Sequence, residues 1–131
     1  MVITCVKHPE TKVLLDDCAS IDADITMIGA SLRTPGMEAS LGIEVIDHDG
    51  LARFFEELAD DYAGWQGERV WRAFQDELVV TAAFHSRGHV ELRWRLELEA
   101  PAWSATVTTW VHAGEDMRRL AADLHAMFAA R

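Results

Sequence analysis

The sequence predicts an α+β domain, with antiparallel β-sheet and two main helices in the order strands, helix, strands, helix. Apolar residues recur at helical spacing in only two segments, near 50–63 and 115–129. Elsewhere apolar and polar residues alternate, which is typical of strands with one buried face. The strand connections are too short for parallel crossovers. We therefore expect one domain over residues 1–131, with both helices packed on one face of a twisted sheet.

The first 47 residues predict strands alone. We place them near 2–6, 12–16, 22–32 and 37–46. Pro35-Gly36 is a turn signal between the last two. The sequence leaves open whether these strands form a sheet of their own or complete the main one.

The first helix, near 50–63, has one apolar stripe, made by Leu51, Phe54, Phe55, Leu58 and Tyr62. Asp49 is the candidate N-cap, and Gly64 fits the position after the helix end. Four acidic residues lie mainly off the stripe and predict an acidic outer face: Glu56, Glu57, Asp60 and Asp61.

A β-meander is predicted between the helices. A short strand near 69–74 precedes a hairpin joined by Ser86-Arg87-Gly88. The core faces of the hairpin are Leu78, Val80, Ala82 and Phe84 on one strand, and Val90, Leu92, Trp94, Leu96 and Leu98 on the other. A further strand follows over 103–112. The last helix, 115–129, has Glu115 and Asp116 in its first turn, where the helix dipole favours negative charge.

Composition indicates a single folded soluble domain. The 131 residues include 12 Lys and Arg against 22 Asp and Glu, for a net charge of −10, and half of them are hydrophobic. This balance argues against a nucleic-acid partner, which requires cationic charge. No signal peptide or membrane-length apolar run is visible, so we expect a cytoplasmic protein that does not bind membranes. Cys5 and Cys18 are expected to be reduced thiols in that compartment, with a disulfide as the alternative.

The negative charge is concentrated in one half of the chain. Residues 1–61 hold 13 acidic and 4 basic residues, whereas residues 62–131 hold 9 and 8. A one-sided field attracts cationic partners and raises their association rate. The plainer interpretation is that the charge maintains solubility.

Few residues suggest catalysis or metal binding. His85 and His89 flank the hairpin turn, and Glu91 shares a strand face with His89. A zinc site needs three or four converging ligands, so we expect these to be ordinary turn-flanking residues, with no metal and no cofactor. Neither cysteine lies at a predicted helix N-terminus, which favours small buried residues over nucleophiles. Nucleotide-binding, serine-hydrolase, zinc-protease and calcium-loop motifs are absent.

Two of the five tryptophans are candidate contact residues. Trp65 and Trp94 fit core positions. Trp71 and Trp110 each point opposite an apolar neighbour, Val70 and Val111. Each is therefore either a partly exposed binding aromatic or a residue packed under a helix on the second sheet face.

Several runs resemble an uncharacterised family. They are Phe54-Phe55-Glu56-Glu57-Leu58-Ala59, Gly64-Trp65-Gln66-Gly67 with Trp71, Gly88-His89-Val90 with Leu92, Trp103, and Gly114-Glu115. They resemble a domain of unknown function common in actinobacteria, most closely over residues 45–131. More distantly, the order of elements is similar to the WapI-type immunity proteins, which neutralise a toxin encoded beside them. Neither resemblance implies catalytic residues.

We expect a non-catalytic binding protein, of the immunity type, that neutralises a basic partner such as a toxin. The expected contacts are Glu56, Glu57, Asp60, Asp61, Trp71 and Trp110. The alternative is a small-ligand binder or enzyme with a pocket lined by tryptophan and a histidine such as His89 or His112. The chain is expected to be a monomer, or a homodimer formed through a strand edge.

Overall fold

The strands form two separate antiparallel sheets, and the computed structural model describes residues 1–46, 48–99 and 102–130. The first sheet has the strand order β1-β2-β3-β4. Its strands are β1 (Val2–Thr4), β2 (Lys12–Ser20), β3 (Thr26–Thr34) and β4 (Met37–Val45). The four N-terminal strands therefore form a sheet of their own, a point that the sequence left open.

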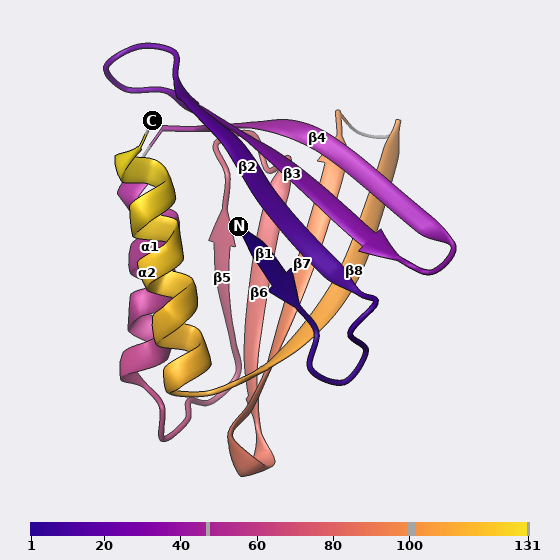
Figure 1. Ribbon diagram of the computed structural model, residues 1–131, viewed down its shortest axis with the longest axis vertical. Helices are drawn as coiled ribbons and strands as arrows, with labels where there is room; N and C mark the ends of the chain where they lie inside the picture. The colour runs from indigo at the N-terminus through magenta and orange to yellow at the C-terminus, as the bar shows by residue number, and fades with distance from the viewer. Residues whose placement is uncertain (47, 100–101, 131) are drawn as a thin grey trace.

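The second sheet has the strand order β5-β6-β7-β8. Along the chain, one helix precedes its first strand and the other follows its last strand. Its strands are β5 (Glu68–Arg72), β6 (Leu78–His85), β7 (His89–Leu98) and β8 (Trp103–His112). The helices are α1 (His48–Asp60) and α2 (Glu115–Ala129), which lie side by side (Figure 1). The order strands, helix, strands, helix is confirmed, as is the antiparallel α+β class.

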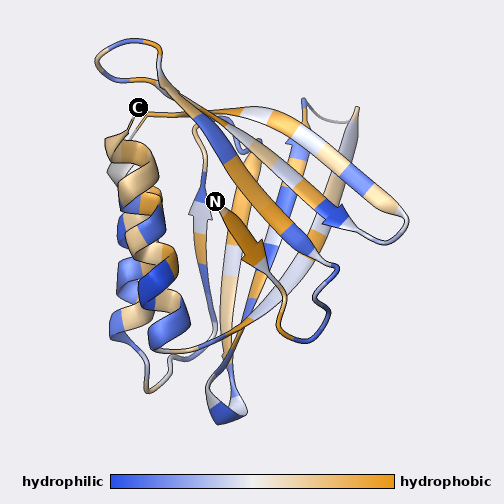
Figure 2. Ribbon diagram, viewed as in Figure 1, coloured by the Kyte–Doolittle hydropathy of each residue, from blue (hydrophilic) through white to orange (hydrophobic). Residues whose placement is uncertain are grey.

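One hydrophobic core joins both sheets and both helices. Apolar and polar residues alternate along the strands (Figure 2), and the predicted inward faces of β6 and β7 are buried from Leu78 to Ala82 and from Val90 to Leu96. Phe55 of α1 stacks on Trp94 of β7, with ring centroids 5.9 Å apart. The buried Trp94 indole donates a hydrogen bond of 2.9 Å to Thr109 Oγ1 on β8. This bond satisfies the one polar atom of the largest core side chain.

Several predicted boundaries differ for local reasons. β3 begins at Thr26 rather than at residue 22, because the Asp22 side chain folds the preceding residues into a turn. Its Oδ1 accepts hydrogen bonds from the backbone N–H groups of Asp24 and Ile25, at 2.8 and 2.9 Å. In β2, the pairing is irregular between Asp16 and Ala19.

The first helix is shifted toward the N-terminus relative to the prediction. Helix α1 begins at His48, so Asp49 lies inside it rather than at the N-cap, and the Asp49 side chain is outside the described residues. Because the helix ends at Asp60, Tyr62 does not belong to the apolar stripe and is 61% exposed. Leu98 is also exposed, at 41%, because β7 ends there beyond the core.

Gly64 is required where the chain leaves α1. Its φ is +116°, and a Cβ built there lies 3.0 Å from the Phe84 ring. We expect Gly64→Ala to lower the free energy of unfolding by about 2 kcal/mol, since backbone strain adds to overlap with the ring. Gly67 is the matched control, because its φ is +73° but a Cβ meets nothing within 4 Å. Gly67→Ala should cost only about 1 kcal/mol in urea unfolding, and equal losses would contradict a role for Phe84.

Candidate functional site

The four predicted acidic contacts are not one free surface. Glu56 of α1 is hydrogen-bonded to His125 Nε2 of α2. Asp61 accepts a hydrogen bond of 2.5 Å from Arg69 Nη1. Glu57 and Asp60 are exposed on α1. Two of the four carboxylates are therefore already engaged within the chain.

The two candidate tryptophans lie on opposite faces of the second sheet, on β5 and β8. Trp71 of β5 is partly buried against the core, and its neighbour Val70 is the exposed residue, at 46%. Trp71 therefore packs against the core and is still partly exposed, so its role as a contact residue stays a prediction.

Trp110 lies on the outer face of β8 under the chain segment that follows β1. Lys7 Nζ lies 3.5 Å from its ring centroid, and the His85 ring centroid is 4.9 Å away. The backbone N–H of Val6 donates to Trp110 O at 2.8 Å, and Trp110 N–H donates to the sulfur of Cys5 at 3.3 Å. Trp110 thus connects the N-terminal segment to the second sheet, and buried Cys5 is part of that contact.

The histidines of the hairpin form a row rather than a metal centre. His85, His89 and His112 stand opposite one another on β6, β7 and β8. His85 Nε2 is 2.9 Å from Glu91 Oε1, and the His89 and His112 rings are 5.3 Å apart. Among the residues that the structure describes, no group of three His, Cys, Asp or Glu side chains is arranged to hold a metal ion.

The structure contains one hollow that partly matches the alternative prediction of a pocket lined by tryptophan and histidine. A hollow of about 430 Å³ beside Gly64 is lined in part by Trp65, Phe84 and His85. Trp65 packs edge-on against Phe84, with centroids 5.3 Å apart, and the Arg69 guanidinium lies 5.0 Å from its ring. The aromatic surfaces of this hollow are therefore already in contact with the protein itself.

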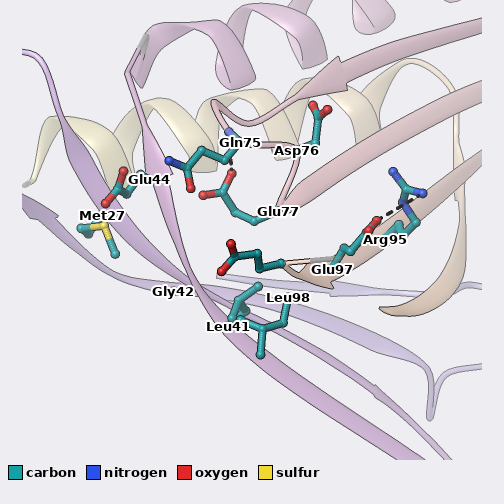
Figure 3. A pocket seen from close by; sticks show the side chains of 11 residues that line it. Met27, Leu41, Gly42, Glu44, Gln75, Asp76, Glu77, Arg95, Glu97 and Leu98 are labelled. Atoms are coloured by element: carbon teal, nitrogen blue, oxygen red, sulfur yellow. Dashed lines mark hydrogen bonds and ion pairs between the residues drawn. The ribbon is translucent and has the colours of Figure 1, made fainter. Parts of the chain in front are cut away.

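A larger cleft of about 720 Å³ opens between the two sheets (Figure 3). One wall comes from β3 and β4, and the other from the turn between β5 and β6 and from the end of β7. The lining residues are Met27, Leu41, Gly42, Glu44, Gln75, Asp76, Glu77, Arg95, Glu97, Leu98 and Glu99. The exposed Leu98 is therefore a wall of this cleft.

The cleft is strongly acidic. Five carboxylates and one guanidinium line it, and the acidic residues are Glu44, Asp76, Glu77, Glu97 and Glu99. Arg95 Nη1 lies 3.6 Å from Glu97 Oε2, and Glu77 Oε1 accepts a hydrogen bond of 3.0 Å from the backbone of Gln75. Within the described residues, Glu44 and Glu99 make no ion pair.

Sequence reasoning missed this site because its walls come from distant parts of the chain. Glu44 belongs to the first sheet, whereas Glu97 belongs to the second. Asp76-Glu77 was visible only as an adjacent acid pair, and Glu97 and Glu99 as the water-facing side of a strand. Their convergence depends on how the two sheets pack, which no local pattern records.

Comparisons with known proteins place the chain in a family whose function is not assigned. Among the described residues, no helix has the length and apolar character needed to cross a bilayer. Neither the curated proteins nor the solved structures contain a match. The comparison with protein families matches residues 4–131, which include both helices, the second sheet and all of the first sheet except the start of β1. The chain therefore belongs to the family of unknown function DUF6228.

Proposed function

We propose that this protein is a non-catalytic binding protein that receives a cationic segment of a partner protein in the cleft between its sheets. The observation that carries the proposal is the excess of five carboxylates over one arginine around a cleft of about 720 Å³. A concave site lined by one sign of charge concentrates ligands of the other sign.

The cleft also offers apolar contacts suited to lysine and arginine. Met27, Leu41 and Leu98 line it together with the carboxylates. Long basic side chains lay their aliphatic stems on apolar surface while the charged ends reach polar groups. An arginine can also bond a carboxylate through two parallel N–H groups. A peptide segment with basic residues satisfies both kinds of surface.

The remaining negative charge assists the encounter. With a net charge of −10, the protein attracts a basic partner before contact, and exposed carboxylates on α1 such as Glu57 and Asp60 add to that field. An immunity-type role in the cytoplasm, in which the partner is a basic toxin, is the more specific form of the proposal. In that form the bound segment is withheld from the toxin's own anionic substrate.

The test compares two variants of equal net charge. The cleft variant carries Glu44→Gln, Glu77→Gln and Glu97→Gln. The control variant carries Glu10→Gln, Asp24→Asn and Asp123→Asn, all at exposed sites away from the cleft. Tagged wild-type protein and both variants are incubated with lysate of the native host, washed at low salt and eluted in salt steps. A partner of the cleft is a basic protein retained by the wild type and the control but lost from the cleft variant.

The dissociation constants of the wild type and both variants for that purified partner are then measured and compared. We expect the cleft variant to bind about 10- to 100-fold more weakly than the wild type, and the control less than about threefold more weakly. Equal weakening in both variants would show that only net charge matters. Unchanged affinity of the cleft variant would refute the site.

A further inference from the structure

Three arginines lie close together on the outer face of the second sheet, although the chain as a whole is acidic. Arg72, Val79, Arg95 and Thr106 stand directly opposite one another across β5, β6, β7 and β8. Thr81 and Arg93 form part of the next row on the same face, because residues two apart on a strand point the same way. Leu78, Val80 and Trp94 point to the opposite face, into the core.

These two rows enclose a small hollow. Its volume is about 220 Å³, and it is lined by Arg72, Val79, Thr81, Arg93, Arg95 and Thr106. None of these lining residues is acidic. Val79 is only 6% exposed although it faces outward. The hollow thus has three guanidinium groups, two hydroxyl groups and an apolar floor.

Each arginine is held from outside the hollow by a carboxylate. Arg93 Nη2 lies 2.7 Å from Glu68 Oε2, Arg95 Nη1 lies 3.6 Å from Glu97 Oε2, and Arg72 Nη1 lies 3.8 Å from Asp76 Oδ1. Each contact uses one terminal nitrogen of a group that has five N–H donors. Of these contacts, only Arg93–Glu68 is a hydrogen bond, so the three guanidinium groups keep N–H donors for a further acceptor.

We propose that this hollow binds a tetrahedral oxyanion, the phosphate group of a small phosphorylated molecule or inorganic phosphate itself. Guanidinium groups match phosphate oxygens through paired hydrogen bonds, and the two threonine hydroxyls supply neutral donors. Three guanidinium groups line the hollow, and each is already paired with one carboxylate outside it. At about 30 Å³ per water, the hollow holds roughly seven waters, which suits a phosphate with a small attached group. The overall charge of −10 argues against a nucleic acid, because the repulsion grows with the number of phosphates.

The test is an amide NMR titration of the full chain with inorganic phosphate and, separately, with phosphoserine. Sodium chloride at matched ionic strength is the control for screening. We expect saturable shifts centred on Val79, Thr81 and Arg93, with a dissociation constant below about 1 mM. Tighter binding of phosphoserine would identify a phosphorylated molecule as the ligand, and equal binding would identify phosphate. Shifts that do not saturate, or that chloride reproduces, would overturn the proposal.

Arg93→Gln should weaken binding at least tenfold, and Arg93 lines the hollow but not the acidic cleft. Arg33→Gln is the matched control, because Arg33 is also a strand arginine paired across the sheet, 3.2 Å from Glu38. It should change the dissociation constant less than twofold. If Arg93→Gln fails to fold, Thr81→Val supplies a second variant, with a loss of at least threefold expected. Wild-type affinity in a folded Arg93→Gln would refute the site and leave the cleft proposal unaffected.

Discussion

Replacing Phe55 by alanine should lower the free energy of unfolding by about 3–5 kcal/mol. Phe55 is fully buried and joins α1 to the second sheet. Its ring stacks on Trp94, with planes 18° apart, and meets Phe54 edge-on at 5.5 Å between centroids. Alanine removes both aromatic contacts and leaves a cavity that the surrounding strands cannot close. Urea or guanidinium unfolding followed by tryptophan fluorescence measures the loss.

Phe74→Ala is the matched control, because Phe74 is 60% exposed. The same chemical change there should cost less than about 0.5 kcal/mol. Where Phe55→Ala does not fold, Phe55→Leu keeps much of the volume and should lose less than half as much. Equal losses at positions 55 and 74 would contradict the packing of α1 on the second sheet.

Thr109→Val should cost about 1–3 kcal/mol, because it leaves the Trp94 indole N–H buried without an acceptor. Both residues are 0% exposed, and their hydrogen bond is 2.9 Å long. In the described part of the chain, every buried side-chain nitrogen and oxygen has a partner. Valine keeps the shape of threonine, so the lost hydrogen bond accounts for the change. The measurement is again denaturant unfolding.

A double-mutant cycle separates this bond from general packing. In a Trp94→Phe background the donor is absent, so adding Thr109→Val should cost less than about 0.5 kcal/mol. Thr108→Val, on the outer face of the same strand, is the positional control and should be nearly neutral. A full cost for Thr109→Val in the Trp94→Phe background would show that the hydrogen bond is not the cause.

The periodic elements of the fold were predictable because each depends on neighbouring residues. The last helix and the strand over 103–112 have the predicted bounds, and Pro35-Gly36 is the turn between β3 and β4. Predicted boundaries were wrong where a single side chain changed the local structure. The predicted start of β3 is an example, because the Asp22 side chain forms a turn there. The division into two sheets was not predictable, because strand pairing across long sequence separations leaves no local pattern.

In the candidate site, too, patterns of neighbouring residues were predictable, whereas contacts between distant residues were not. The acidic face of α1 is a helical pattern and was visible, yet the fold pairs Glu56 with His125 and Asp61 with Arg69. The two partners of each pair lie on different elements, so the sequence did not show the pairing. The cleft and the arginine hollow each collect side chains from several strands. Whether Trp71 lies on the buried face of the sheet could not be predicted for another reason, because β5 has an apolar residue on each face.

The N-terminal segment anchors the first sheet to the second at a point far from the cleft. Val6 and Cys5 hold the first sheet to Trp110, whereas the cleft opens near the other end of the second sheet, beyond Leu98, which pairs with Trp103. Trp110 and Trp103 are seven residues apart, or about 24 Å along an extended strand. Over this span, a tilt of one sheet by one degree about the Trp110 contact would move the cleft walls by about 0.4 Å. The first sheet is thus anchored to β8 at the end opposite the cleft, through four backbone and sulfur atoms, in addition to the shared core.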